Sequence, residues 1–142
     1  MEEQPPKKVL VLVVEDEPAI LTALHHVIEK KGLRVFEAKN GEEGLLVAFR
    51  EHPDLILLDI VMPVMDGWTM LQKIREHDAW GKQVPVIVLT NLSVDEDPQI
   101  RHIVELGPAY FLEKSDWKVE GVTDKIFEVL NRDKHNSQGY AS

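Results

Sequence analysis

Asp54-Leu55-Ile56-Leu57-Leu58-Asp59, continued by Ile60-Val61-Met62-Pro63-Val64-Met65-Asp66-Gly67, is the stretch that decides the fold. Four consecutive apolar residues between polar ones are typical of a strand buried on both faces, as in a parallel sheet. Open α/β sheets place their ligands at the carboxyl ends of such strands, which is where Asp59 stands. The stretch therefore predicts a carboxylate on a rigid strand end, suited to holding a metal ion or to acting as a nucleophile.

Length and composition restrict the class of protein. The chain has 142 residues, which favours a single domain with its own core. It has no cysteine, which excludes disulfides, thiolate zinc sites and cysteine nucleophiles. The net charge of −9 argues against direct nucleic-acid binding. No apolar run approaches the roughly 18–20 residues of a membrane span, and the N-terminus lacks a signal-peptide pattern. We expect a cytoplasmic protein without membrane insertion.

Apolar runs alternate with amphipathic segments along the whole chain. The runs predict strands at residues 9–14, 35–36, 55–58, 84–90 and 110–112. Segments with apolar residues at helical spacing follow them at residues 20–28, 45–49, 68–74, 100–106 and 122–130. This order predicts an α/β fold, a doubly wound five-stranded parallel sheet joined by right-handed crossovers. We place the domain at residues 9–131, with a flexible lead-in at 1–8 and a polar tail at 132–142.

Capping residues mark where the predicted helices begin and end. Pro18 suits a first helical position, and Asp16 stands where a side chain can cap that helix. Asn40 with Glu43 three positions later predicts a capping box for the second helix. Gly32 can supply the left-handed residue after the first helix.

Polar side chains stand at the carboxyl ends of the predicted strands. They are Glu15 and Asp16 after the first strand, Asp59 after the third, Thr90 after the fourth, and Glu113-Lys114 after the fifth. These ends share one edge of a parallel sheet, so we expect the side chains to converge. Clustered carboxylates repel one another, and a hard cation such as Mg²⁺ relieves that repulsion. A carboxylate can also attack phosphorus, and a lysine and a hydroxyl can then bind the phosphoryl oxygens.

Four motifs, in this order, resemble the receiver domain of response regulators in two-component signalling. They are Val13-Val14-Glu15-Asp16-Glu17-Pro18, the stretch from Asp59 through Met62-Pro63 to Met65-Asp66-Gly67, Thr90, and Phe111-Leu112-Glu113-Lys114. The resemblance extends over roughly residues 8–131. It implies a flavodoxin-like, chemotaxis-type fold with strand order 2-1-3-4-5.

The resemblance implies that Asp59 is the phosphoacceptor. It further implies that Mg²⁺ is bound by the carboxylates of Asp16 and Asp59 and by the backbone carbonyl of Val61, while Glu15 acts through a water molecule. The cofactor expected for this chain is therefore Mg²⁺.

The remaining implied roles belong to the fourth and fifth strands. Lys114 would pair with the acceptor and later with the phosphoryl group, Thr90 would bond a phosphoryl oxygen, and Phe111 would occupy the aromatic switch position. The chain departs from the family pattern twice. Asn91 replaces the usual small residue, and Ser115 replaces the usual proline. A cis bond before serine costs about 3 kcal/mol, so we expect a trans peptide and a differently shaped loop there.

Together these features predict a single-domain response regulator. It would accept a phosphoryl group on Asp59 from a sensor histidine kinase or a histidine phosphotransfer protein, and Mg²⁺-dependent switching would then change a face that binds an unknown downstream protein. About a dozen residues follow the last predicted helix, so we expect no output domain after it and expect the output to come through a partner. We do not expect the chain to be an enzyme that acts on a separate substrate. We expect a receiver that promotes its own aspartyl phosphorylation and dephosphorylation.

Other readings remain for the chain and for single residues. The main alternative is a receiver-fold interaction module that does not switch, which Asn91 and Ser115 would favour. A haloacid-dehalogenase-like phosphatase would need an aspartate at Val61. A dinucleotide-binding enzyme would need a glycine-rich turn in place of residues 15–17. Taken alone, Phe111 also fits a core position.

The adjacent His25 and His26 invite a metal-site reading. Neighbouring helix positions do not face each other, so the pair is poorly placed to grip one ion. We predict a solvated helix surface there.

Overall fold

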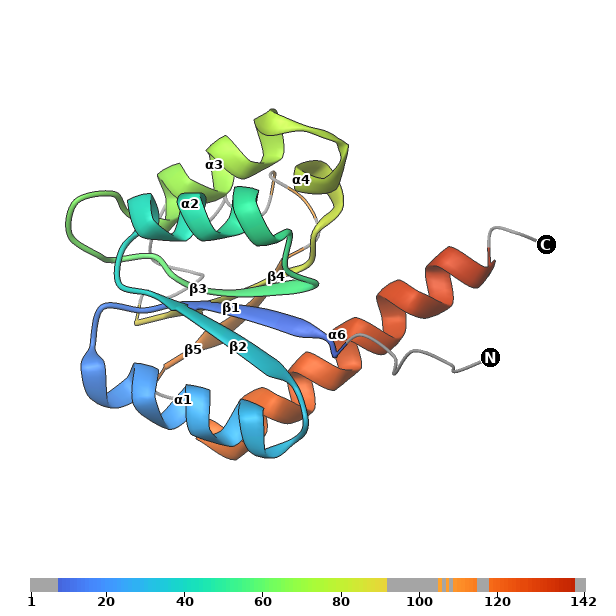
Figure 1. Ribbon diagram of the computed structural model, residues 1–142, viewed down its shortest axis with the longest axis horizontal. Coiled ribbons are helices and arrows are strands. Elements are labelled where there is room, and N and C mark those ends of the chain that lie inside the picture. The colour runs from blue at the N-terminus through green and yellow to red at the C-terminus, as the bar shows by residue number, and fades with distance from the viewer. Residues whose placement is uncertain (1–7, 92–104, 106, 108, 115–117, 140–142) are drawn as a thin grey trace, which may run out of the picture.

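One parallel sheet organises the chain. The computed structural model describes residues 8–91, 105, 107, 109–114 and 118–139. Its strands are β1 (Leu10–Val14), β2 (Arg34–Ala38), β3 (Leu55–Asp59), β4 (Val86–Thr90) and β5 (Ala109–Glu113). They pair in parallel in the order β2-β1-β3-β4-β5. This confirms the predicted flavodoxin-like sheet. The carboxyl ends of its strands lie at the left of the sheet in Figure 1.

Helices cover both faces of the sheet (Figure 1). One layer contains α2 (Gly41–Glu51), α3 (Gly67–His77) and α4 (Ala79–Gln83), and the other contains α1 (Pro18–Lys30) and α6 (Val119–Gly139). Successive strand residues point into alternate cores: Leu12, Ile56 and Val88 pack in one, and Val11, Leu57 and Ile87 pack in the other. The central strands are buried from both sides, which explains their unbroken apolar sequences and makes their ends a rigid platform.

The predicted cap of α2 by Asn40 is confirmed, because Glu43 N donates to Asn40 Oδ1 (2.9 Å). The return contact of the predicted capping box differs, since the Asn40 side chain and not its backbone N–H donates to Glu43 Oε2 (3.2 Å). The predicted cap at α1 is wrong. Glu17, not Asp16, holds the N-cap position, and its side chain makes no capping hydrogen bond. Pro18 takes the first helical position and has no N–H to satisfy, which lowers the need for a cap. The Asp16 side chain is therefore available for other contacts.

A short helix that the sequence analysis did not predict, α4, follows α3 directly. Asp78 begins it, because its Oδ1 accepts from Gly81 N at 2.7 Å. The buried Arg75 closes the corner, since its Nη1 donates to the carbonyl oxygens of Gly81 and Val84, both at 2.8 Å. These contacts set where the chain enters β4.

At the C-terminus, α6 continues to Gly139, eight residues beyond residue 131, where the domain was expected to end. The predicted helix at 100–106 lies outside the described residues, apart from Glu105, which is helical. The expected lead-in lies outside them as well, except for Lys8.

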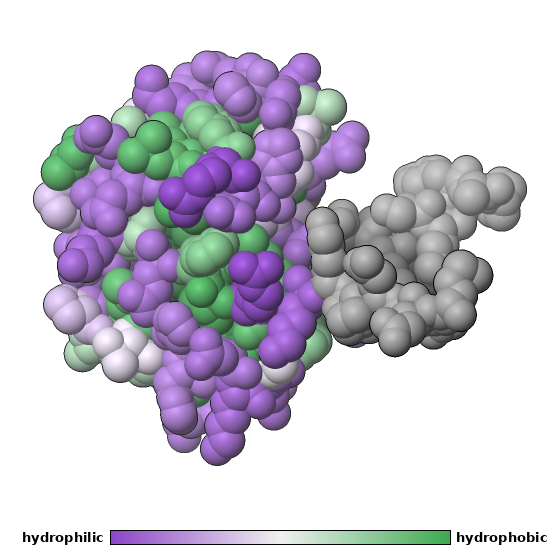
Figure 2. Space-filling view, in the orientation of Figure 1, coloured by the Kyte–Doolittle hydropathy of each residue, from purple (hydrophilic) through white to green (hydrophobic). Residues whose placement is uncertain are grey.

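The surface shown in Figure 2 is mainly hydrophilic, with smaller groups of apolar side chains between the polar ones. This agrees with a chain in which 29% of the residues are charged. Within the described part of the chain, no helix combines the length and the apolar character needed to cross a bilayer.

His25 contacts two carboxylates that the sequence did not predict, and one of these contacts joins α1 to β2. Its Nδ1 lies 2.6 Å from Glu37 Oε2 on β2, and its Nε2 lies 3.1 Å from Glu29 Oε2 on α1. Burial lowers the pKa of His25, but the hydrogen bonds and negative charges of Glu37 and Glu29 outweigh it and raise the pKa above its ordinary value of 6.5.

This contact makes stability depend on pH. A histidine whose pKa is raised in the folded state contributes stability that is complete below its unfolded pKa, about 6.5, and that is lost as the pH rises through the folded pKa. The side chains are partly exposed, so we expect a contribution of only about 0.5 kcal/mol. Urea unfolding at about pH 5.5 and about pH 8 should show a smaller pH dependence in His25→Gln than in the wild type or in His26→Gln. An unchanged pH dependence in His25→Gln would contradict this assignment.

Candidate functional site

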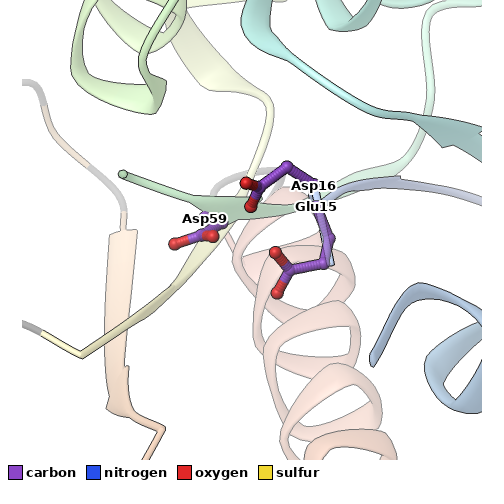
Figure 3. Close-up of side chains that lie close together, drawn as sticks. All are labelled: Glu15, Asp16 and Asp59. Carbon is purple, nitrogen blue, oxygen red and sulfur yellow. The ribbon is translucent and has the colours of Figure 1, made fainter. Parts of the chain in front are cut away.

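Three carboxylates meet where β1 and β3 end. Glu15, Asp16 and Asp59 each offer one oxygen, and these oxygens lie within 4.8 Å of one another. Figure 3 shows the three side chains side by side at the strand ends. Pairing of β1 with β3 sets this placement, and Glu15 N donates to the carbonyl of Ala38 (3.0 Å). Glu15 and Asp59 are only 1% and 4% exposed, while Asp16 is half-buried.

Lys114 reaches this cluster from the end of β5. Its Nζ donates to Asp59 Oδ2 at 3.2 Å and lies 2.8 Å from Glu15 Oε1. Its backbone N donates to the carbonyl of Thr90 (2.8 Å), which ties the end of β5 to the end of β4. The lysine side chain is only 7% exposed, so water screens its charge less than at the surface. The sequence prediction that these strand ends converge is confirmed for these residues.

Burial and charge together shift the ionisation of the site. Burial, and then the neighbouring Glu15 carboxyl, raise the pKa of Asp59 to about 7, although Lys114 opposes the shift. Burial lowers the pKa of Lys114, but the charges of Glu15 and Asp59 outweigh it and the net change is a rise. A single ammonium therefore does not fully compensate the buried carboxylates.

The residues present fit a hard divalent cation. All donors in the cluster are oxygens, which suit Mg²⁺ or Ca²⁺ and not a soft metal. The buried Glu15 Oε1 has an ion-pair contact with Lys114 but no hydrogen bond within the described residues, so it retains acceptor capacity. The raised pKa of Asp59 also agrees with a cation site, because burial and Glu15 disfavour its charged form and a bound cation would favour it again.

The loop after β3 is held close against Asp59. Gly67 N donates to the carbonyl of Ile60 (2.9 Å), and a Cβ atom at Gly67 would lie 2.1 Å from the carbonyl oxygen of Asp59. Asp66 caps α3, since its Oδ1 accepts from Thr69 N at 2.7 Å. From the sequence, residues 66–67 were recognised only as part of a motif, and the need for glycine at this close approach was not predicted.

The other predicted site residues lie around the cluster. Thr90 is fully buried at the end of β4, one position beyond the partner of Asp59 in that strand. Phe111 is half-buried and packs against the core on the α2–α3 side. Val61, two residues after Asp59, is 62% exposed. Asn91 is exposed, and Ser115 lies outside the described residues.

A separate pocket opens at the opposite ends of the strands, where β3 and β4 begin. It has a volume of about 220 Å³ and is lined by His52, Pro53, Asp54, Trp80, Gln83, Val84 and Pro85. His52 and Trp80 stack there with ring centroids 4.5 Å apart. The carboxylate cluster and Lys114 lie at the other ends of the strands, and the chemistry of the site belongs to them.

Sequence comparison identifies a matching family model and several similar proteins. Residues 11–126 match the family model of the response regulator receiver domain. Transcriptional regulatory protein AfsQ1 of Streptomyces coelicolor is 40% identical in an alignment 137 residues long that covers 93% of this chain and 56% of that protein. Protein PilH of Pseudomonas aeruginosa is 36% identical over 87 residues, 61% of this chain and 71% of that protein.

Solved structures that resemble this chain include a signal receiver domain and a chemotaxis response regulator. The signal receiver domain of a signal transduction histidine kinase from Syntrophus aciditrophicus is 30% identical, with a TM-score of 0.74 over 87% of this chain and 90% of that one. The chemotaxis response regulator CheY4 of Vibrio cholerae is 26% identical, with a TM-score of 0.76 over 87% of this chain and 99% of that one. The chain spans about half the length of several curated relatives, for example 56% of AfsQ1 and 52% of a probable transcriptional regulator ycf27. It belongs to the response regulator receiver domain family.

Proposed function

We propose that this receiver domain accepts a phosphoryl group on Asp59 from a sensor histidine kinase or a histidine phosphotransfer protein. The observation that carries the proposal is the position of the Asp59 carboxylate. It ends a rigid central strand, it lies 3.2 Å from the Lys114 ammonium, and it shares a cluster with Glu15 and Asp16. This geometry supports a role for Asp59 as the nucleophile and for Lys114 as the positive charge that would stabilise the product.

In the proposed transfer, a carboxylate oxygen of Asp59 attacks the phosphorus atom of the donor phosphohistidine. A new oxygen–phosphorus bond forms while the phosphorus–nitrogen bond breaks, and the electron pair stays on the imidazole nitrogen, which is then protonated. The Lys114 ammonium and the Thr90 hydroxyl would donate to the phosphoryl oxygens. The protein modifies itself in this reaction and does not turn over a separate substrate.

Mg²⁺ is the cation proposed for the site. The carboxylates of Asp16 and Asp59 and the backbone carbonyl of Val61 would hold it, and Glu15 would act through a bound water. When bound, the ion would offset the negative charge that the phosphoryl group brings to the cluster.

Replacing Asp16 with alanine should weaken Mg²⁺ binding by about 10- to 100-fold, because water substitutes poorly for a charged oxygen ligand. Titration of Mg²⁺ followed by amide chemical shifts measures the affinity. Glu42→Ala, which removes an exposed carboxylate in the first turn of α2, is the matched control and should bind like the wild type. Equal affinity in Asp16→Ala and the control would contradict the metal assignment.

We further propose that phosphorylation switches a face that binds a downstream protein. The phosphoryl oxygens would draw Thr90 towards Asp59, and the hydrogen bond from Lys114 N to the Thr90 carbonyl would carry that shift to β5. Phe111 lies on β5 and is only half-buried, so it has room to change its packing. The phosphoryl group can drive this change only because it makes different contacts in the two states.

The function is tested by incubating the protein with a small phosphodonor and Mg²⁺ and then measuring the intact mass. We expect a mass gain of one phosphoryl group. Adding a chelator before the donor should abolish the gain or slow it by about 100-fold, since the carboxylate cluster then repels the donor without compensation. A folded protein that gains no mass with Mg²⁺ present would contradict the proposal.

A further inference from the structure

A third carboxylate lies at Lys114, in addition to those of Glu15 and Asp59. Glu17 Oε1 is 3.6 Å from Lys114 Nζ, compared with 2.8 Å for Glu15 and 3.2 Å for Asp59. The three differ in exposure. The side chains of Glu15 and Asp59 are 1% and 5% exposed, while that of Glu17 is 54% exposed. Glu17 is therefore the member of the set that meets solvent, and an incoming donor, first.

The backbone fixes Glu17 in this place. Its N–H donates to Glu15 Oε2 at 3.3 Å, and Pro18 follows it at the start of α1. Glu17 stands at the N-cap position, where a side chain normally accepts a hydrogen bond from the first turn of the helix, yet it makes no such bond. Its carboxylate is directed to Lys114 instead. The residue thus contributes negative charge to the mouth of the acceptor site, not a cap to the helix.

We propose that Glu17 is a positioning residue that selects phosphodonors by their charge. The proposal rests on phosphoryl acceptance at Asp59. Any phosphoryl group that reaches Asp59 must come close to Lys114, and therefore to Glu17, which repels it and competes for the same ammonium. The repulsion grows with the negative charge of the donor. A phosphohistidine carried by a protein can bring a cation or a hydrogen-bond donor to face Glu17, whereas a small free anion cannot.

The size of this effect follows from Coulomb's law. Two unit charges separated by about 6 Å of water repel each other enough to slow an encounter about threefold. A doubly charged donor doubles the repulsion energy, which slows the encounter about tenfold. Salt screens an exposed pair, so the difference should shrink as the ionic strength rises.

The test compares two small donors that differ in charge. Acetyl phosphate carries two negative charges near neutral pH and releases acetate as its phosphorus–oxygen bond breaks. Phosphoramidate carries one net negative charge and releases ammonia as its phosphorus–nitrogen bond breaks. In both reactions the same bond forms, between an Asp59 oxygen and phosphorus. Rates are measured at saturating Mg²⁺, established separately for each variant, so that a change in metal affinity does not enter.

We expect Glu17→Gln to accelerate phosphorylation by acetyl phosphate about tenfold and by phosphoramidate about threefold, at low salt. Glu17→Asp, which retains the charge, should stay close to the wild type. Glu42→Gln removes an exposed carboxylate on α2 and should leave both rates unchanged. A purely structural role for Glu17 would change both donors by the same factor and would not depend on salt.

Each outcome decides a different claim. If the wild type is phosphorylated but Glu17→Gln accelerates neither donor, or accelerates both equally, charge selection by Glu17 is overturned and acceptance at Asp59 stands. If the folded wild type takes up no phosphoryl group from either donor, the proposed function fails and the role of Glu17 fails with it.

Discussion

Replacing Gly67 with alanine is expected to destabilise the protein by about 2–3 kcal/mol. The added Cβ would lie 2.1 Å from the carbonyl oxygen of Asp59, a backbone atom at the end of a central strand that cannot move aside without disturbing the sheet. The first turn of α3 must then shift away, together with the hydrogen bond from Gly67 N to the Ile60 carbonyl. Urea unfolding measures the change as a lower midpoint at constant slope.

The matched control is Gly121→Ala. Gly121 lies in the first turn of α6, and a Cβ there has nothing within 4 Å. This substitution should leave stability unchanged or raise it by up to about 1 kcal/mol, because alanine has the better helix propensity. Equal stability of Gly67→Ala and the wild type would show that the loop yields easily and that the close approach to Asp59 is not needed.

Gly67→Ala should also affect the site. A backbone shift at Asp59 moves its carboxylate relative to Lys114, and small misplacements of reacting groups are costly in rate. In Gly67→Ala, phosphorylation should therefore slow even at temperatures where the variant remains folded. The requirement for glycine at this position is a property of the site as much as of the fold.

The sheet could be predicted from sequence because its strands are buried on both faces. Runs such as residues 55–58 leave few alternatives to a parallel strand, and polar residues mark where each run ends. The convergence of Asp59 and Lys114, 55 positions apart, follows from this topology and not from local sequence. The strand order itself came from the family resemblance.

Other features could not be predicted because they depend on tertiary contacts. The helix α4 is stabilised by the Asp78 cap and by the hydrogen bonds from Arg75 to two carbonyl oxygens. Neither contact produces a periodic pattern of apolar residues from which it could be predicted. The assignment of the α1 cap to Asp16 failed because Asp16 and Glu17 are both acidic, and only the backbone decides which of them begins the helix. The contact between Glu17 and Lys114 was not predicted either, because Glu17 was considered only as part of a motif.

The identity of the phosphorylated residue is the most direct test of the account. Wild type, Asp59→Asn and Asp54→Asn are incubated with a small phosphodonor and Mg²⁺, and their intact masses and phosphorylated peptides are compared. Asp54, an exposed residue directly before β3, is the matched control. Leu10 N donates to Asp54 Oδ2 at 2.8 Å, and the amide oxygen of an asparagine there can accept the same hydrogen bond. Asp59→Asn should fold at least as stably as the wild type, because it removes a buried carboxylate whose pKa is raised to about 7.

We predict a gain of one phosphoryl group in the wild type and in Asp54→Asn, with the modification on the peptide that contains Asp59, and no gain in Asp59→Asn. Phosphorylation of Asp59→Asn at the wild-type rate, or a modified peptide that does not include residue 59, would contradict the account.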